Sequence, residues 1–296
     1  MRQAAAVDDE QPLAGGVDPS AGVVRVGDTV RRPAGGSSDA VRRLLLHLES
    51  VGFDGAPRFL GTDEKGRDVL TFVPGDVPLP PYPAWALTDS ALQDLGRLVR
   101  RFHEATATFD AASVTGWSRS WADPSGGPVI CHNDLFPENV VFRDGHVVAL
   151  IDFPEAAPGR PFWDLAIAAE EWAPLHAPGA RLHHPDDLDG VRRTALLAQA
   201  YGVDPDRAEE LMDVVAEERT QQLAHVRAEA AAGTEPWASL WRDTDGEGRA
   251  AADDRWLRDQ RPALVHAVRR AASTQPPPGP GAPSEVGGPD PSPYRG

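Results

Sequence analysis

Cysteine and lysine are almost absent from this chain of 296 residues. Cys131 is the only cysteine, so an internal disulfide and a cysteine-based zinc site are both excluded. A lone cysteine is typical of a reducing compartment, and we expect Cys131 to be a small buried hydrophobe on a strand. Lys65 is the only lysine. A site that binds phosphate groups would therefore depend on arginine for its positive charge.

The chain also lacks an apolar run long enough to cross a bilayer, and its first residues carry the acids Asp8, Asp9 and Glu10 instead of a signal sequence. We therefore expect a cytoplasmic protein that does not bind membranes. The net charge of −16 repels phosphate backbones, which disfavours nucleic acid as a partner. The same acid excess could attract a cationic substrate or could serve only solubility. The oligomeric state is unknown from the sequence.

The N-terminal quarter predicts a small strand-rich lobe over residues 20–75. Two hairpins are expected, one across the turn Gly27-Asp28 and one around residues 63–66, because short β-branched runs flank these turns. Between the hairpins, apolar residues recur at helical spacing over residues 39–49. Residues 1–19 show little periodic pattern and are expected to be flexible.

A larger, mostly helical lobe is expected over residues 76–273. It follows a stiff proline-rich connector, and its first helix begins near Asp89 with leucines on one face. A strand at 129–131 and a hairpin at 140–151 precede a helical remainder. Residues 274–296 are rich in Pro, Gly and Ser and predict a disordered tail. The fold class is therefore α+β, with a ligand cleft expected between two lobes.

The most informative stretch reads H-x-D-x-x-x-x-N, from His132 through Asp134 to Asn139, and Asp152 follows one hairpin later. Asp134 comes directly after a strand, where its carboxylate can point into the cleft and accept the proton of a hydroxyl nucleophile. Asn139 and Asp152 offer oxygen ligands of the kind that Mg²⁺ prefers. Because the hairpin returns the chain, Asp152 can lie beside Asn139. These residues predict a site for phosphoryl transfer from ATP bound with Mg²⁺.

Other residues give weaker alternatives. His103 and His146 lack the spacing of a helical zinc site, and we expect His103 on the polar side of its helix. Trp172 could line a substrate pocket, but such residues are more often helix-packing anchors. A cationic amine could be attracted by the acids Glu170, Glu171, Asp186, Asp187 and Asp189, although an exposed acidic surface is the commoner arrangement.

Over residues 129–166 the chain resembles the catalytic core of the aminoglycoside phosphotransferase and choline kinase family. The family pattern is H-G-D-x-x-x-x-N, then I-D-[FW], then D-x-A or D-L-A. It is matched here by His132-Asn133-Asp134 with Asn139, by Ile151-Asp152-Phe153 and by Asp164-Leu165-Ala166. The resemblance implies a protein-kinase-like fold, with Asp134 as catalytic base and with Asn139 and Asp152 as magnesium ligands. It also implies that His132 braces the loop and that Asp164 ties it to the next helix.

The small lobe departs from the family pattern. The family places a basic residue of the third strand against the nucleotide phosphates, and of Arg31 and Arg32 we assign Arg31 to this role. The helix that follows has no evident glutamate to pair with it. By the same resemblance, Phe72 and Val73 are expected to approach the adenine as the hinge between the lobes. The glycine-containing stretch 15–22 could cover the phosphates or be a flexible linker.

Two functions are consistent with these features. The first is an ATP-dependent phosphotransferase that acts on a hydroxyl of a small molecule, with a cationic acceptor as one option. The second is a non-catalytic or weakly active binding or immunity protein on the same fold, because the usual lysine and the helix glutamate are missing. Measurable phosphate transfer would separate the two.

Overall fold

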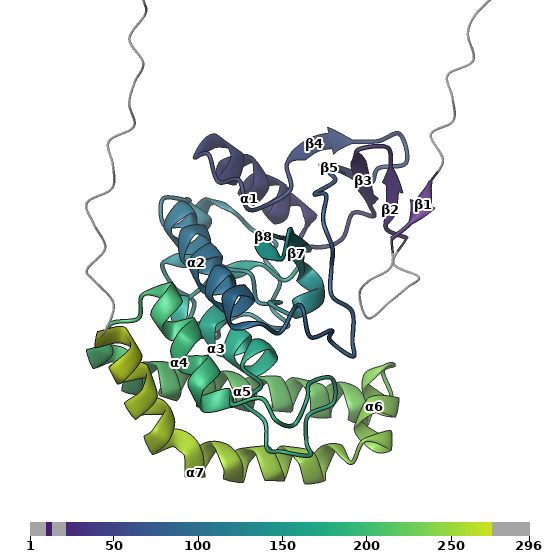
Figure 1. Cartoon of the computed structure of the whole chain (residues 1–296). Helices are drawn as coiled ribbons and strands as arrows, with labels where there is room; N and C mark the ends of the chain where they lie inside the picture. The colour runs from purple at the N-terminus through teal and green to yellow at the C-terminus, as the bar shows by residue number, and fades with distance from the viewer. Residues whose placement is uncertain (1–9, 14–21, 274–296) are drawn as a thin grey trace, which may run out of the picture.

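The computed structural model describes residues 10–13 and 22–273, and Figure 1 shows their arrangement. A small antiparallel sheet with one helix lies above a larger, mainly helical part. This architecture confirms the predicted α+β class with two unequal lobes. Most of the segment predicted to be a flexible terminus, nearly all of the glycine stretch and the whole C-terminal tail lie outside the described residues.

Five short strands form the sheet of the small lobe, in the order β1-β2-β3-β5-β4, and all neighbours are antiparallel. Both expected hairpins are present, with Gly27 and Gly66 at positive φ in their turns. β1 falls within the segment expected to be flexible, but it pairs with β2, and Glu10 beside it forms an ion pair with Lys65. The strands are β1 (Gln11–Pro12), β2 (Val24–Val26), β3 (Thr29–Arg32), β4 (Phe59–Thr62) and β5 (Asp68–Thr71).

The register of this sheet decides which side chains face the larger lobe. Opposite residues of antiparallel strands share a face, and so do alternate residues along one strand. Val30 is opposite Leu70 on one side and Arg25 on the other. Arg32, two residues further along β3, is opposite Asp68. These five side chains therefore lie on one face, which we call the inner face.

Helix α1 (Ser38–Ser50) packs against the inner face beside β4 and β5. Leu44, Leu45 and Leu48 are buried and join the main hydrophobic core, as their helical spacing predicts. The Nε of Arg42 donates to the Asp68 carboxylate at 2.7 Å, which attaches the helix to β5.

The chain then enters the larger lobe through a proline-rich connector. Asp76 exchanges two backbone hydrogen bonds of 2.8 Å with Phe142, so the connector runs beside the strand that carries Phe142. Gly75 precedes this contact with a φ of 154°, and a Cβ there would lie 2.2 Å from the Phe142 carbonyl oxygen. Only glycine allows this close approach.

Four strands and six helices make up the larger lobe in the described part of the chain. β6 pairs with β9, and β7 forms a hairpin with β8. The strands are β6 (Val129–Cys131), β7 (Val140–Arg143), β8 (His146–Leu150) and β9 (Ala157–Gly159). The helices are α2 (Asp89–Thr106), α3 (Pro161–Trp172), α4 (Gly190–Tyr201), α5 (Ala208–Ala232), α6 (Trp237–Asp243) and α7 (Gly246–Ser273).

One hydrophobic core links α1, α2, the short strands and helices α3 to α5 and α7. Trp163 and Trp172 are buried within it, which confirms the interpretation of Trp172 as a packing anchor. Cys131 is fully buried on β6, also as expected. Among the helices described, none combines the length and the apolar character needed to span a membrane.

Candidate active site

The loop with the predicted catalytic residues joins β6 to β7. Immediately after β6, Asn133 adopts a φ of 63°, a left-handed conformation that asparagine tolerates better than most residues. A 3₁₀ turn at Pro137–Asn139 then leads directly into β7. The local backbone therefore presents Asp134 and Asn139 from one short loop.

A buried carboxylate, Asp164 on α3, anchors this loop. Its Oδ2 accepts the backbone N–H of His132 at 2.7 Å, and its Oδ1 accepts that of Asn133 at 2.9 Å. His103 Nε2 lies 3.0 Å from the same Oδ2, and His103 Nδ1 lies 3.0 Å from the hydroxyl of Tyr201. The expectation of a polar-side His103 is therefore wrong: the ring is buried because both nitrogens find partners inside the core.

Asp134 and Asn139 are in direct contact. The Nδ2 group of Asn139 donates to the Asp134 carboxylate at 2.8 Å and to the Asp134 carbonyl oxygen at 2.9 Å. Burial, followed by repulsion from the carboxylates of Asp152 and Glu155, raises the pKa of Asp134 to about 7. A carboxylate with a pKa near neutrality is suited to accept a proton from a hydroxyl group.

The β7–β8 hairpin brings the chain back to Asn139 at Ile151, the residue before Asp152. The N–H of Ile151 donates to the carbonyl oxygen of Asn139 at 2.9 Å. Asp152 then takes a φ of 67°, which turns the chain away from β8 and forms a corner at Asp152. His132 braces the same corner, since its Nε2 lies 3.0 Å from the carbonyl oxygen of Ile151.

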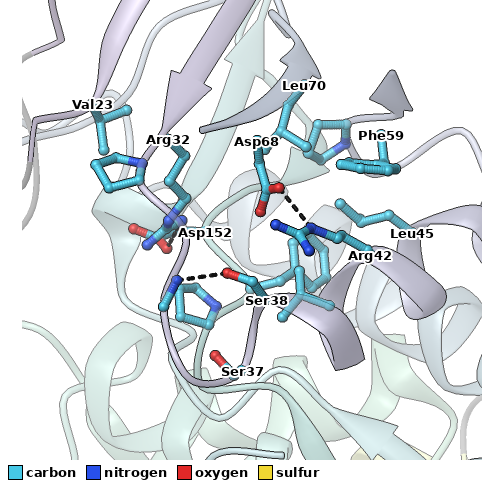
Figure 2. Close-up of a pocket in the computed structure, with 16 residues that line it drawn as sticks. Val23, Arg32, Ser37, Ser38, Arg42, Leu45, Phe59, Asp68, Leu70 and Asp152 are labelled. Atoms are coloured by element: carbon cyan, nitrogen blue, oxygen red, sulfur yellow. Dashed lines mark hydrogen bonds and ion pairs between the residues drawn. The ribbon is translucent and has the colours of Figure 1, made fainter. Parts of the chain in front are cut away.

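Arg32, rather than Arg31, is the basic residue that reaches Asp152. Its guanidinium group forms an ion pair with the Asp152 carboxylate (Figure 2). Arg31 lies on the opposite face of β3, where it donates to the hydroxyl of Thr29 and lies 3.8 Å from Asp63. Side chains of a strand alternate between faces, so a shift of one residue reverses the direction of the side chain. The structure does not bring Arg31 to the other candidate residues.

Helix α1 gives Arg32 no acidic partner. Its two acids, Asp39 and Glu49, form ion pairs with Arg42 and Arg58 instead. Arg32 therefore depends on Asp152 for its ion pair within the described residues.

A cavity of about 220 Å³ lies between the inner face, α1 and the corner at Asp152 (Figure 2). Arg32 and Asp152 lie on one side of it, and the pair Arg42 and Asp68 lies on the other. Much of the remaining lining is apolar and includes Val23, Val41, Leu45, Phe59, Leu70 and Phe153. Because Arg32 and Asp152 are part of the lining, the cavity adjoins the candidate metal site.

The residues at this corner fit a divalent cation. Oδ1 of Asp152 receives no hydrogen bond from any described residue, although Arg32 is in ion-pair contact with it. The carboxylates of Asp152 and Glu155 lie close enough to Asp134 for their charges to raise its pKa. With the amide oxygen of Asn139, these groups are the hard oxygen ligands that Mg²⁺ prefers, and a cation would relieve their repulsion.

Phe72 and Val73, the expected hinge residues, follow β5 and do not contribute to this cavity. The central carbon of the Arg25 guanidinium lies 3.8 Å from the centre of the Phe72 ring. The N–H of Phe72 donates to the carbonyl oxygen of Asp28 at 2.9 Å, which extends the pairing of β5 with β3. The role of these two residues toward the adenine stays a prediction.

Of the five acids expected on an exposed surface, Asp186, Asp187 and Asp189 are exposed, whereas Glu170 and Glu171 are not. Glu170 is buried and forms an ion pair of 2.7 Å with Arg219 of α5. Glu171 is half-buried, and burial together with the charge of Glu170 raises the pKa of Glu171 well above its usual range. Helix α3 is packed on nearly all sides, so Glu170 lies inside the lobe and Glu171 is partly covered.

An acidic cluster, defined as Glu138, Glu171 and Glu218, lies near Asp134. The charges of Glu138, Glu218 and Asp134 contribute to the raised pKa of Glu171. Tyr82 donates its hydroxyl to Glu138 at 2.7 Å. Glu218 is 4% exposed, and its Oε2 has no hydrogen-bond partner in the described structure. A cation bound among these carboxyl groups would relieve their repulsion and favour their ionised form. Sequence reasoning missed Glu138 and Glu218, although Glu138 directly precedes Asn139 in the motif.

Comparison with known proteins identifies the family. A model of the phosphotransferase enzyme family matches residues 115–211, which include the loop, the hairpin and Asp164. The trifolitoxin immunity protein of Rhizobium leguminosarum bv. trifolii is 33% identical over 256 residues, covering 80% of this chain and 93% of that protein. The chain belongs to the phosphotransferase enzyme family.

Two solved structures share the fold of this phosphotransferase-family chain. A choline/ethanolamine kinase family protein from Mesorhizobium loti has a TM-score of 0.59 at 16% identity, covering 90% of this chain and 94% of that one. An aminoglycoside 2′-phosphotransferase in complex with GDP has a TM-score of 0.57 at 17% identity, covering 82% and 93%. At these identities the likeness concerns the fold, and it confirms the protein-kinase-like class.

Proposed function

We propose that this protein transfers the γ-phosphoryl group of ATP, bound with Mg²⁺, to a hydroxyl group of a small molecule. The observation that carries the proposal is the contact of Asp134 with Asn139 beside the corner at Asp152. A base with a pKa near neutrality, an amide oxygen and a carboxylate that fits a metal ion are thereby next to one another. Membership in the phosphotransferase enzyme family supports the same activity.

In this reaction Asp134 accepts the proton of the acceptor hydroxyl while the hydroxyl oxygen forms a bond to the γ-phosphorus. The bond from that phosphorus to the bridging oxygen breaks, and ADP leaves with the electron pair. Asn139 orients Asp134 through its Nδ2 group and, with Asp152, would hold Mg²⁺. The bound ion would neutralise phosphate charge. Arg32, which is held only by a partly exposed ion pair, would pair with the phosphates.

We also propose that the acceptor is cationic. The acidic cluster near Asp134 supports this, because the charges that act on Glu171 are those of other acids, and Oε2 of Glu218 is buried with no hydrogen-bond partner in the described structure. Leaving such a group unpaired is costly, and a bound ammonium group would relieve the cost. Tyr82, hydrogen-bonded to Glu138, would help to orient the amine.

The proposed reaction requires a compartment that holds ATP and Mg²⁺. Cys131 is a free thiol, buried on β6. A chain with one buried cysteine and no internal disulfide is compatible with a reducing compartment, and we propose the cytoplasm.

A transfer assay with radiolabelled ATP and Mg²⁺ tests the function. The acceptors would be choline, ethanolamine and aminoglycosides, with glycerol as a neutral control. We expect labelled product from a cationic acceptor and a loss of about 10²–10⁴-fold in kcat for Asp134→Asn. A Glu171→Gln variant should raise the KM of the cationic acceptor more than it lowers kcat. Full transfer by Asp134→Asn would refute the assignment of the base.

A second function is favoured by the 33% identity with the trifolitoxin immunity protein. We propose, as the alternative, that the chain protects a cell against a toxin by binding and without phosphoryl transfer. The partly exposed ion pair of Arg32 with Asp152 supports this alternative, because the pair neutralises a metal ligand in the absence of nucleotide.

Protection of a toxin-sensitive strain separates the two functions. The strain would express the unaltered chain or Asp134→Asn at matched levels. Equal protection by both proteins would favour binding alone, whereas protection only by the unaltered chain would favour phosphoryl transfer.

A further inference from the structure

We propose that Arg25, stacked on the ring of Phe72, contacts the base of the purine nucleotide that this protein binds. The inference rests on the proposed function and adds to it a residue that sets nucleotide affinity. Arg25 lies more than 100 residues before the catalytic loop, and no catalytic motif points to it.

Arg25 lies on the inner face of the sheet, as Arg32 does. It is opposite Val30, and Arg32 lies two residues beyond Val30 on β3. Two residues of a strand span about 6.6 Å. The ribose of a nucleotide separates its base from its phosphates by a similar length. A nucleotide with its phosphates at Arg32 therefore has its base within reach of Arg25.

Helix α1 covers only the other part of the inner face. Arg42 of this helix is hydrogen-bonded to Asp68, and neither Arg25 nor Phe72 lines the cavity beneath the helix. Arg25, Val30 and Phe72 are each half-buried, so their side chains keep a surface that a ligand can contact. A planar base that lies under this part of the sheet would meet the Arg25 guanidinium group over the Phe72 ring.

The contacts of Arg25 with the described residues hold its guanidinium group flat against the Phe72 ring. The group stacks on Phe72 at 3.8 Å, a cation–π arrangement. Its Nε donates to the carbonyl oxygen of Gly27 at 2.8 Å, and one terminal nitrogen lies 3.9 Å from the exposed carboxylate of Asp28. The face that is turned away from the Phe72 ring can stack on a purine base.

Calorimetric titration of three ligands tests the proposal: Mg-ATP, Mg-GTP and Mg-tripolyphosphate, which has phosphates but no base. Arg25→Ala should weaken the binding of both nucleotides about tenfold and leave tripolyphosphate unchanged. Arg25→Lys should lose nearly as much, because an ammonium group has no planar surface. Arg58→Ala is the matched control, since that small-lobe arginine pairs with Glu49 on the surface, and all three ligands should bind it as they bind the unaltered chain.

Unchanged nucleotide affinity in Arg25→Ala would overturn the proposal. An equal loss of tripolyphosphate binding would overturn it too, because Arg25 would then act on the phosphates or on the fold. Full nucleotide affinity in Arg25→Lys would also overturn it, because a charge without a planar surface would then be sufficient. If the unaltered chain bound tripolyphosphate and neither nucleotide, the proposed function itself would fail, which is a different result from failure of the Arg25 variants alone.

Discussion

The two halves of the candidate site are held by different kinds of contact. In the larger lobe, the fully buried Asp164 fixes the loop of Asp134 through two backbone hydrogen bonds. Between the lobes, Arg32 of the small lobe and Asp152 of the larger lobe form an ion pair in which the side chains are 29% and 36% exposed. Buried hydrogen bonds to a charged group are costly to remove, whereas partly exposed ion pairs contribute about 0–1 kcal/mol. The difference indicates a rigid catalytic loop and a small-lobe contact that a ligand can open.

Replacement of Asp164 should have the largest effect and is the strongest challenge to this comparison. Asp164→Ala leaves two buried N–H groups and His103 without their partner, so we expect the free energy of unfolding to fall by about 3–5 kcal/mol. Urea denaturation followed by circular dichroism measures the change.

The matched control is Glu247→Ala, which removes an exposed ion pair with Arg227. It should lower the free energy of unfolding by less than about 1 kcal/mol. Equal losses in the two variants would mean that burial of Asp164 does not anchor the loop.

The same contrast explains what could be predicted from the sequence. In the larger lobe, Asp134, Asn139 and Asp152 are tied to one hairpin, and the spacing of a hairpin fixes which residues return beside each other. Their proximity followed from the pattern alone. The direction of the arginine side chains on β3 is harder to predict from the sequence. Arg31 and Arg32 are adjacent, and only the pairing of β3 with β2 and β5 decides which one faces the larger lobe.

The acidic cluster shows a second limit of the sequence. Glu171 and Glu218 lie 47 positions apart in the chain on α3 and α5, and only the packing of these helices brings their charges together. His103 was misjudged for a similar reason, since its partners Asp164 and Tyr201 come from two other helices. Tertiary partners of buried polar groups leave no local pattern.

An effect of intermediate size is expected from replacing Arg32, with the neighbouring Arg31 as the control. Arg32→Ala should weaken the binding of Mg-ATP about tenfold, because a charge-assisted contact to phosphate is lost. Its free energy of unfolding should change by less than about 1 kcal/mol. Arg31→Ala removes contacts to Thr29 and Asp63 on the opposite face and should bind Mg-ATP as the unaltered chain does. A loss of affinity only in Arg31→Ala would reverse the assignment.

The smallest effect concerns the dependence of stability on pH. The pKa of Asp134 rises from 3.8 to about 7 on folding, so the folded state binds more protons than the unfolded state between these values. The contribution of Asp134 to stability is therefore complete below pH 3.8 and is lost as the pH rises through about 7. Asp134→Asn should melt a few degrees above the unaltered chain at pH 8, with a smaller difference at pH 5. A lower melting temperature for Asp134→Asn at pH 8 would contradict the burial of a strained carboxylate.

The most direct measurement is a calorimetric titration of ATP, in the presence and absence of Mg²⁺, into the unaltered chain and into Asp152→Asn. We expect binding that requires Mg²⁺ in the unaltered chain and at least tenfold weaker Mg-dependent binding in Asp152→Asn, with little change in the thermal stability of that variant. Equal Mg-dependent affinity in the two proteins would show that Asp152 holds no metal ion, and the phosphotransferase site described at this corner would be contradicted.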